Sequence, residues 1–417
     1  MRILYSFLTR ISYLFIWIAQ FFSKKMKLFV SGRQTVFKRL AQHITAEDKT
    51  IWFHCASLGE FEQGVPIMEA VKKKFPTHKI IVSFFSPSGY EVKKNTPIAD
   101  VVVYLPLDTL PNAKKFINAV HPSLVLFVKY EFWPNYLFEL KNQNIPTLLV
   151  SGLFRKEQLF FKGYGTFMRK ALKTFDHIFV QDKISEKLLH EINITQVTVS
   201  GDTRFDRVSH QIEQDNTVSF IETFKGNSLC IVCGSTWPED EAVLVKYINE
   251  ATENVKFILA PHNIDASKIE QFRRKLQPSS VLYSEKEGKN LVEYSVFIID
   301  TIGLLTKIYS YADIAYVGGA MGKTGLHNIL EPATFGVPIV IGSNFENFPE
   351  AKRLQQLAGL YAVNSKEEAF EVLNKLVTNV PFREKAGMIA GHFVNSNTGA
   401  TTITLDYINT LHSNGLI

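Results

Sequence analysis

The stretch Gly318–Gly342 constrains the fold more than any other part of this chain. It reads GGAMGKTGLHNILEPATFGVPIVIG and follows the apolar run Ile314–Val317. A glycine-rich turn comes first, then a short helical piece that contains Pro332, and then a second apolar run, Val337–Ile341. This order of strand, loop, helix and strand is the repeating unit of a parallel sheet, which binds ligands at the carboxyl ends of its strands.

The turn in this stretch has the features of a nucleotide site. Glycine N–H groups can approach an anion closely, and the start of a helix adds partial positive charge. Glu331 lies beside the turn, where its carboxylate can accept hydrogen bonds from the two hydroxyls of a ribose. The alternative is a capping box between Asn328 and Glu331. Pro332 disfavours that box, because it would occupy the position where the helix first needs an N–H donor.

Short apolar runs alternate with helical patterns along both halves of the chain. Strands are predicted in the first half at Ile51–Cys55, Lys79–Phe84, Val101–Tyr104, Leu124–Val128, Thr147–Val150, His177–Val180 and Val197–Val199. Strands are predicted in the second half at Leu229–Cys233, Lys256–Ala260, Ser280–Tyr283, Val296–Ile299, Ile314–Val317, Val337–Ile341 and Leu360–Val363. Helices are predicted between the early strands at Glu60–Phe75, Ala113–Val120, Trp133–Gln143 and Gln158–Thr174. Because 417 residues exceed one ordinary core, we predict an α/β fold with two Rossmann-like, doubly wound domains.

The polar segment Asp206–Lys225 interrupts the strand pattern and predicts a linker between the two domains. The resulting boundaries are an anchor at 1–27, a first domain at 28–206, a linker at 207–225, a second domain at 226–395 and a last helix at 396–417. In proteins with two such domains the last helices often cross back to the first domain, which is one option for 396–417.

Residues Ile3–Phe22 predict a membrane-associated helix. The polar exceptions form one narrow helical stripe: Ser6, Arg10, Tyr13 and Gln20. The length suits a bilayer span, but a charge near the middle is costly there, so a helix lying in the interface is an equal alternative. A third option is a helix that docks on its own protein. Basic residues follow the helix and predict that the body of the protein lies on the cytoplasmic side, near anionic lipid: Lys24, Lys25, Lys27, Arg33, Lys38 and Arg39.

Composition excludes several classes of protein. A hydrophobic content of 46% is typical of a globular chain. The net charge of +6 suits an acidic membrane surface or anionic substrates, but it is too diffuse to indicate nucleic acid. Cys230 and Cys233 lie in one apolar run without a second ligand pair, so we expect buried thiols in a reducing compartment rather than a zinc site.

Charged side chains follow four strands of the predicted first domain. They are Glu60 in CASLGEFEQG, Lys129 and Glu131 in VKYEFWPN, Arg155 in SGLFR, and Arg204 in GDTRFD. Glu60 lies where a carboxylate can act as general base on an acceptor hydroxyl. The alternative is an ordinary carboxylate in the first turn of a helix, a role that fits Glu62 better.

Polar residues and glycines follow the strands of the predicted second domain as well. In CGSTWPEDE, Ser235 or Thr236 is predicted to cap a helix with Pro238 in its first turn, and the same geometry binds phosphate. The next strand ends carry His262 and Asn263 in APHN and Gly303 in IDTIGLL. No Asp-x-Asp pair, phosphate loop or nucleophile elbow accompanies these loops. We therefore expect no metal and no cofactor.

Together these motifs resemble those of the 3-deoxy-D-manno-octulosonic acid (Kdo) transferases of lipopolysaccharide and lipid A biosynthesis. ASLGE resembles the family's SVGE, YEFWPN its ELWPN, and GDTRFD its GSLKFD. GSTWPEDE is similar to STHxGEE, IDTIGLL to DTMGEL, and GLHNILEPA to the specific signature GGHNPLEPA. The resemblance covers nearly the whole chain. It implies the GT-B fold of glycosyltransferases, with the two Rossmann-like domains facing a central cleft.

The resemblance also implies roles for individual residues. Glu60 corresponds to the family's catalytic base and Arg204 to a cation that stabilises the transition state, while Lys129 replaces a glutamate that helps there. The implied CMP-sugar site comprises Ser235, Thr236, His262, Asn263, Ile302, Gly303, Leu304, Gly325, His327, Asn328, Ile329, Leu330 and Glu331. Two departures indicate a divergent member: the family's Pro-Arg-His is Pro261-His262-Asn263 here, and Leu304 replaces the glutamate of MGEL.

The implied activity is inverting transfer of Kdo from CMP-Kdo to a lipid A precursor at the cytoplasmic membrane surface, without nucleic acid. Two alternatives stay open. One is a GT-B enzyme that uses a UDP-hexosamine donor on another lipid acceptor. The other is a membrane-bound nucleotide-binding protein without turnover.

Overall fold

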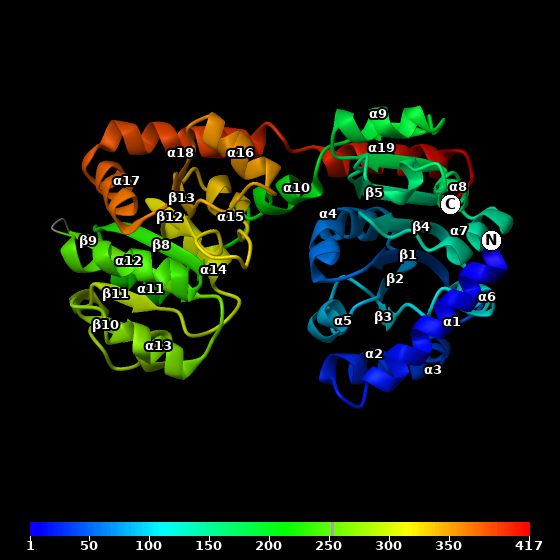
Figure 1. The fold of residues 1–417 in the computed structure, drawn as a ribbon, viewed down its shortest axis with the longest axis horizontal. Helices are drawn as coiled ribbons and strands as arrows, with labels where there is room; N and C mark the ends of the chain where they lie inside the picture. The colour runs from blue at the N-terminus through cyan, green and yellow to red at the C-terminus, as the bar shows by residue number, and fades with distance from the viewer. Residues whose placement is uncertain (252–253) are drawn as a thin grey trace. The chain divides into compact units, whose positions relative to one another are not determined.

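Two seven-stranded parallel sheets organise the chain, one in each of two units (Figure 1). The computed structural model describes residues 1–251 and 254–417. Unit 1 comprises Met1–Arg207 and Thr398–Ile417, and unit 2 comprises Val208–Asn397. The predicted α/β fold with two Rossmann-like, doubly wound sheets is confirmed.

The sheet of unit 1 has the strand order β3-β2-β1-β4-β5-β6-β7. Its strands are β1 (Lys49–Cys55), β2 (His78–Phe84), β3 (Val101–Tyr104), β4 (Pro122–Val128), β5 (Thr147–Gly152), β6 (His177–Val180) and β7 (Val197–Val199). Its helices are α1 (Arg2–Ala19), α2 (Lys24–Gln34), α3 (Val36–His43), α4 (Leu58–Lys74), α5 (Pro87–Lys93), α6 (Leu110–Val120), α7 (Pro134–Asn142), η1 (Leu159–Phe161), α8 (Thr166–Leu172), α9 (Lys183–Glu191), α10 (Thr203–Ser209, which ends just inside unit 2) and α19 (Ala400–Ser413).

Helices cover both faces of this sheet, which explains why its strands are apolar on both sides. Ile51 and Phe53 of β1 pack with α4 on one face, and Trp52 between them packs with α6 and α7 on the other. The C-terminal helix α19, red in Figure 1, belongs to this unit. Its residues Ile408 and Leu411 lie in the same core as α4.

Asp206 holds the start of α19 against unit 1. Its Oδ1 accepts a hydrogen bond from Gly399 N at 2.6 Å, and its Oδ2 accepts from Thr401 N at 3.0 Å and Thr401 Oγ1 at 3.1 Å. A carboxylate at this position satisfies N–H groups that a helix start leaves unpaired. The return of the last helix therefore depends on a residue almost two hundred positions earlier in the chain.

The sheet of unit 2 has the strand order β10-β11-β9-β8-β12-β13-β14. Its strands are β8 (Leu229–Thr236), β9 (Val255–Pro261), β10 (Ser280–Leu282), β11 (Val296–Ile298), β12 (Ile314–Val317), β13 (Ile339–Gly342) and β14 (Leu360–Val363). Its helices are α11 (Ser219–Lys225), α12 (Pro238–Glu250), α13 (Ala266–Arg273), η2 (Tyr283–Glu285), η3 (Leu291–Glu293), α14 (Leu305–Ile308), η4 (Tyr309–Tyr311), α15 (Leu330–Thr334), α16 (Pro349–Gln356), α17 (Lys366–Thr378) and α18 (Val380–Asn395).

Two segments differ from what the sequence predicts. The segment 207–225 contains the end of α10 and all of α11, and Ile221 and Phe224 of α11 are buried in a core of unit 2, so its second half is not a free linker. The predicted helix Gln158–Thr174 is divided into η1 and α8. Gly165 explains the division, because a Cβ there would clash with the carbonyl of Leu159.

The order of strands along each sheet reverses near its centre, and in unit 2 the strand β11 also lies between β9 and β10. In unit 1 the reversal lies between β1 and β4, and in unit 2 it lies between β8 and β12. Doubly wound sheets bind ligands outside the carboxyl ends of the strands at this point. A ligand site is therefore expected at the loops that follow these four strands.

Candidate functional site

Glu60 lies at the reversal point of unit 1, where β1 leads into α4. Ser57 is the N-cap of α4 and forms a capping box with Glu60. Glu60 Oε2 accepts a hydrogen bond from Ser57 N at 3.1 Å and another from Ser57 Oγ. Within the described part of the chain, Glu60 Oε1 has no hydrogen-bond partner. One carboxylate oxygen is thus held in place while the other is available.

Glu60 is therefore the carboxylate in the first turn of the helix, a role that was predicted to fit Glu62 better. Glu62 Oε1 instead pairs with Lys93 Nζ at 2.8 Å, and its Oε2 lies 3.4 Å from Arg207 Nε. The register of the helix explains the difference. Glu60 is the third residue of α4 and can reach back to the cap, whereas Glu62 is the fifth residue and lies about half a turn further along.

Charged groups surround Tyr130 beside Glu60. Burial raises the pKa of the Tyr130 hydroxyl, while Arg155 and Arg204 act to lower it and Asp202 and Glu60 act to raise it. Arg204 Nε and Nη2 both lie 2.8 Å from Asp202 Oδ2. The structure thus brings together residues from the loops after β1, β4, β5 and β7, as the sequence predicts.

Lys129 follows β4 with a positive φ of 68°. This left-handed conformation is uncommon for a residue with a side chain and often marks a functional loop. The Lys129 ammonium lies 5.2 Å from the centre of the Tyr130 ring. Its position links the predicted catalytic lysine to the same group of side chains as Arg204.

Glu131 turns back toward the sheet rather than standing free at the strand end. Its Oε2 lies 3.1 Å from His54 Nε2 and accepts a hydrogen bond from Trp133 Nε1 at 2.7 Å. His54 is fully buried, and its Nδ1 lies 2.8 Å from Ser83 Oγ. This network fixes the loop that carries Lys129 and Tyr130.

In unit 2, β8 extends further than predicted, and the N-cap of α12 is a different residue. The prediction that Ser235 or Thr236 caps α12 is wrong, because β8 runs through Thr236 and the N-cap position falls on Trp237. Asp240 Oδ2 accepts the Trp237 N–H at 2.9 Å. Ser235 has a φ of 54°, at an irregularity in the pairing of β8 with β9. Thr236 is buried, and its hydroxyl donates to Glu241 at 3.3 Å.

The first turn of α12 is acidic, since it holds Glu239, Asp240 and Glu241. These carboxylates already occupy the positive end of the helix dipole. A phosphate would gain little at this helix start, so the glycine-rich loop after β12 is the better position for it.

Three aromatic rings from three loops stack at the reversal point of unit 2. Trp237 and His262 have ring centres 4.7 Å apart at an interplanar angle of 20°, and His262 and His327 are 4.5 Å apart. Trp237 Nε1 donates a hydrogen bond to His327 Nε2 at 3.0 Å. Burial, helped by the neighbouring His262, lowers the pKa of His327 to about 4. His327 is therefore neutral at pH 7, as an acceptor of the indole N–H must be.

The glycine-rich loop after β12 is tightly packed against β8. The buried Asp240 accepts hydrogen bonds from Gly319 N at 2.8 Å and from Tyr316 Oη at 2.9 Å. A Cβ at Gly318 would clash with the Ser235 carbonyl and lie 2.8 Å from Thr236 Cα. Glycine is required at this position because the loop backbone and the strand backbone touch.

Asn328 and Glu331 interact directly, but they do not form the capping box that the sequence allowed. Asn328 Oδ1 accepts from Leu330 N at 3.1 Å, and its Nδ2 donates to Glu331 Oε1 at 3.1 Å. The N-cap of α15 is Ile329. Glu331 Oε2 also accepts from Thr306 Oγ1 at 3.3 Å, which joins this loop to α14, the helix that follows β11.

The remaining predicted residues of this site fall into two groups. Ile329 and Leu330 are buried, so only their backbone atoms can contact a ligand. The others lie in loops: Asn263 lines a cavity of about 230 Å³ together with Trp237 and Lys268, Ile302 is 84% exposed, Gly303 and Gly325 have φ values of 92° and 96°, and Leu304 is the N-cap of α14.

Sequence reasoning missed three residues that the structure places among these groups. Asp202 holds Arg204, Trp237 completes the ring stack, and Thr306 binds Glu331. A tryptophan directly after a strand was a usable signal for Trp237. No local pattern indicates Asp202 or Thr306, because each acts through a partner that lies elsewhere on the loop or in another loop.

A family model described as 3-deoxy-D-manno-octulosonic-acid transferase (kdotransferase) matches residues 33–207, which lie in unit 1. A 3-deoxy-D-manno-octulosonic acid transferase of Haemophilus influenzae is 28% identical over 378 residues, covering 86% of each chain. A bifunctional glycosyltransferase/methyltransferase of Fusobacterium nucleatum is 27% identical over 366 residues. That match covers 83% of this chain and 55% of the Fusobacterium protein, so the chain spans about half of that relative.

A solved structure shares the fold of the whole chain. The UDP-GlcNAc 2-epimerase from Neisseria meningitidis bound to UDP-GlcNAc matches with a TM-score of 0.61 and 15% identity, covering 87% of this chain and all of that chain. At this identity the likeness shows the fold alone, which is the GT-B fold with two Rossmann-like sheets.

Proposed function

We propose that this chain is a 3-deoxy-D-manno-octulosonic acid (Kdo) transferase, which the family-model match and the Haemophilus relative support. It transfers Kdo from CMP-Kdo to a lipid A precursor with inversion at the anomeric carbon. In this proposal unit 1 binds the lipid acceptor and unit 2 binds the CMP-sugar. The reaction takes place at the cytoplasmic face of the inner membrane.

The proposal rests on the hydrogen bonding of the two Glu60 carboxylate oxygens. The carboxylate lies at the reversal point of the unit 1 sheet, with Oε2 held by Ser57 and Oε1 without a partner among the described residues. A general base needs this combination, because it must be fixed in orientation and still have a lone pair for the incoming proton. A cap residue alone would not need the surrounding cations.

Glu60 would take the proton from a sugar hydroxyl of the lipid acceptor. The hydroxyl oxygen then forms a bond to the anomeric carbon of Kdo, on the face opposite the phosphate. The bond between that carbon and the CMP phosphate oxygen breaks, and CMP leaves with the electron pair. The proton remains on Glu60, and the configuration at the anomeric carbon is inverted.

Charge develops on the leaving phosphate and on the sugar ring during this step. Arg204 would stabilise the developing negative charge, with Asp202 holding its guanidinium in place at 2.8 Å. We assign Lys129 a similar role, since its strained backbone presents it beside Tyr130. The donor sugar carries a carboxylate, and the positive charge of Lys129 would stabilise that carboxylate in the site.

Unit 2 offers groups suited to a nucleotide. The Trp237–His262–His327 stack presents flat rings of the kind against which a base can pack. Glu331 and Asn328 offer a carboxylate and an amide for ribose hydroxyls, and Gly318 and Gly319 let the loop backbone approach a phosphate. We assign the remaining loop residues Ser235, Thr236, Asn263, Ile302–Leu304 and Gly325 to the same site.

The direct test is the variant Glu60→Gln, assayed with CMP-Kdo and lipid A precursor, with the lipid product weighed by mass spectrometry. We expect transfer to fall by about 10³-fold or more, because the amide cannot accept the proton. CMP binding, measured by calorimetry, should stay within about twofold of the wild type.

The matched control is Glu62→Gln, which makes the same chemical change on the same helix. Glu62 forms only half-exposed ion pairs, so its loss should change transfer by less than about threefold. Equal loss in both variants, or near-normal transfer by Glu60→Gln, would remove the base assignment. A parallel panel of CMP- and UDP-sugars tests the donor, and transfer from a UDP-hexosamine alone would overturn it.

A further inference from the structure

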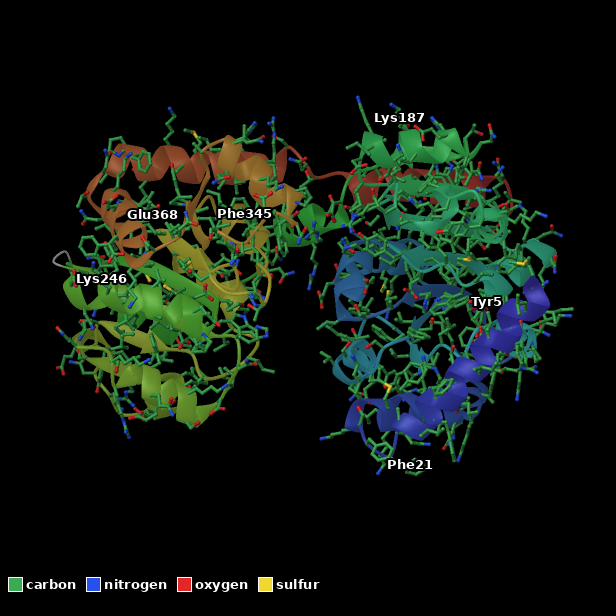
Figure 2. All side chains as sticks on the ribbon, viewed as in Figure 1. Tyr5, Phe21, Lys187, Lys246, Phe345 and Glu368 are labelled. Atoms are coloured by element: carbon green, nitrogen blue, oxygen red, sulfur yellow. The ribbon has the colours of Figure 1, made fainter. Side chains whose placement is uncertain are left out.

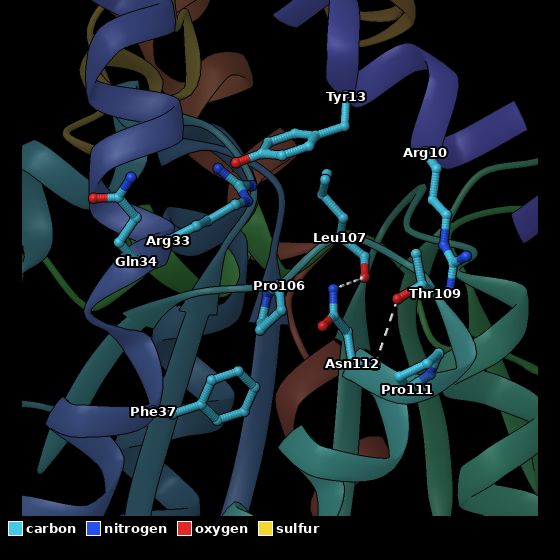
Figure 3. Close-up of a pocket in the computed structure, with 10 residues that line it drawn as sticks. All are labelled: Arg10, Tyr13, Arg33, Gln34, Phe37, Pro106, Leu107, Thr109, Pro111 and Asn112. Atoms are coloured by element: carbon cyan, nitrogen blue, oxygen red, sulfur yellow. Dashed lines mark hydrogen bonds between the residues drawn. The ribbon is translucent and has the colours of Figure 1, made fainter. Parts of the chain in front are cut away.

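A cavity lies between α1 and the rest of unit 1 (Figure 3). Its volume is about 440 Å³, within the range of about 300–1,000 Å³ that is typical of small-molecule sites. Its polar lining includes Arg10 and Tyr13 of α1, Arg33 and Gln34 of α2, and Thr109 and Asn112 at the start of α6. Because α6 follows the edge strand β3, this cavity is separate from the reversal point where Glu60 lies.

The inner face of α1 is fastened to unit 1 by polar contacts. Arg2 Nε donates to Asn135 Oδ1 at 2.9 Å, and Asn135 Nδ2 donates to Ser6 Oγ at 3.2 Å. Tyr5, labelled in Figure 2, is hydrogen-bonded to the buried Asp108. The polar stripe predicted from the sequence therefore faces the protein, so α1 lies along unit 1.

The outer face of α1 is apolar and uncovered. None of its residues is buried, and it is long and apolar enough to cross a bilayer by length and composition alone. Its large exposed apolar side chains include Ile3 at 88%, Phe7 at 58%, Leu14 at 56% and Phe15 at 67%. A helix with its polar face on the protein and its apolar face outward is suited to lie in the membrane interface. The cavity behind it then lies at the depth of lipid head groups.

The cavity is positively charged and has no compensating acid. Its lining contains two guanidinium groups and no carboxylate. Arg33 donates to the carbonyl oxygens of Leu105, Phe29 and Phe85 at 2.9, 2.9 and 2.7 Å. A guanidinium carries five N–H groups, so two remain without an acceptor among the described residues. Arg10 is exposed on α1 and forms no ion pair within the same part of the chain.

The start of α6 adds to this positive character. Thr109 caps α6 through a hydrogen bond from Asn112 N to its hydroxyl at 3.4 Å. Residues of the cap and first turn line the cavity, so the positive end of this helix opens on it. In Figure 3, Arg10 extends from α1 toward Thr109, and Tyr13 extends toward Arg33. The positive groups thus converge from three elements.

We propose that this cavity binds the phosphate of an anionic membrane phospholipid. Paired N–H groups of arginine match the oxygens of a phosphate diester. Phe37, Pro106 and Leu107 add an apolar part to the lining, suited to the glycerol and upper acyl chain of the same lipid. The proposal rests on the membrane association proposed above, and it assigns one lipid molecule as the contact that fixes unit 1 on the bilayer.

The test uses a short-chain lipid that stays monomeric, so that binding does not depend on a bilayer. Dihexanoyl-phosphatidylglycerol is titrated into the full-length protein below its critical micelle concentration and followed by calorimetry. We expect saturable binding of one lipid per chain. Arg10→Gln should weaken this binding by at least tenfold, and Gln34→Glu, which places a carboxylate in the cavity, should abolish it.

The matched control is Lys25→Gln, which removes one exposed positive charge outside the cavity. It should leave binding of the monomeric lipid within twofold of wild type, although it weakens attachment to anionic vesicles. Circular dichroism and thermal unfolding should show that all three variants fold. If the protein binds the monomeric lipid but does not attach to vesicles, the lipid site is supported and the proposed membrane association is not.

Three results would overturn the proposal. One is the absence of saturable binding, and the second is equal weakening by Arg10→Gln and Lys25→Gln, which would indicate diffuse surface charge. The third is inorganic phosphate, or the phosphorylated head group of a lipid A precursor, displacing the phospholipid at lower concentration than it binds. That outcome would assign the cavity to a free anion or to the acceptor.

Discussion

The reversal points of the two sheets present different chemistry at equivalent places. In unit 1 the loops carry charges held by partners, such as Glu60 on Ser57 and Arg204 on Asp202. In unit 2 they carry stacked rings, and His327 is neutral at pH 7. Charged groups suit proton transfer and a developing ionic transition state, while neutral rings suit a base. One fold thus divides the proposed work between two sites.

The two points also differ in how tightly the backbone is packed. Gly318 touches the backbone of β8, whereas a Cβ at Gly59 would meet only Ser57 Oγ at 3.9 Å. The ring stack and the glycine loop of unit 2 depend on contacts between loops, but the capping box of unit 1 is made within one helical turn. Replacing the glycine beside the reversal point should therefore cost more stability in unit 2 than in unit 1.

The largest effect is expected from Gly318→Ala. Its Cβ would clash with backbone atoms of Ser235 and Thr236, so the loop or β8 must shift, which should destabilise the protein by about 3 kcal/mol. Gly59→Ala lies in open space in the first turn of a helix and should stabilise by up to about 1 kcal/mol. Denaturant titration of both variants measures the difference, and equal changes would contradict the comparison.

Arg204→Gln tests the charged character of unit 1. Removing one preorganised cation should lower kcat by about 10²-fold, equivalent to about 3 kcal/mol, with CMP binding unchanged. Arg207→Gln is the matched control, since Arg207 Nε lies 3.4 Å from Glu62 Oε2 and Arg207 has no assigned part in the transfer, and it should retain most activity. A loss of CMP affinity in Arg204→Gln without a change in kcat would argue against the assigned role.

Two aspartates cap helices at different distances along the chain: Asp206 caps α19, almost two hundred residues later, and Asp265 caps α13, which directly follows it. Asp206→Ala removes the acceptor for Gly399 and Thr401, and it should cost about 2 kcal/mol and speed hydrogen exchange throughout α19. Asp265→Ala removes an ordinary cap in unit 2, where Asp265 accepts from Ser267 N and Lys268 N in the first turn of α13, and should cost about 1 kcal/mol. Unchanged exchange in α19 would show that its core contacts alone hold it.

The smallest effect is a pH dependence in unit 2. The pKa of His327 is about 4 in the folded protein and about 6.5 in the unfolded chain, so the unfolded state binds the extra proton first. Stability from this group is complete above pH 6.5 and is lost as pH falls toward 4. Allowing for partial exposure, the loss is about 1 kcal/mol.

His327→Gln keeps an acceptor for the Trp237 indole and removes the titration. The unfolding midpoint of this variant should vary less between pH 7.5 and pH 5 than that of the wild type. An NMR titration that finds His327 protonated with a pKa near 6.5 would contradict the neutral ring stack.

Much of the fold was readable from sequence, as two examples show. Ile314–Val317 and Val101–Tyr104 were predicted with the bounds that the structure has, because buried parallel strands are short apolar runs between turn residues. The helix Gln158–Thr174 was less readable, because its break depends on Gly165 meeting the carbonyl of Leu159. The linker prediction overlooked Ile221 and Phe224, whose burial depends on a core formed by distant strands.

The site was only partly readable. Glu60, Arg204, His262, His327 and Glu331 were placed at strand ends, and the structure groups them in two sets. Their partners were not predictable, because Asp202, Trp237 and Thr306 act through side-chain orientations that no local pattern records.

By itself the sequence determined which segments become strands and helices and which loops carry polar residues, since periodicity and turn residues act over a few positions. Only the tertiary structure decided the strand order, and with it the two reversal points, because pairing joins residues far apart in the chain. It also decided that Ser57 holds Glu60, that Asp206 receives α19, and that the polar stripe of α1 faces unit 1. Each of these results depends on a contact whose free energy exists only once both partners are in place.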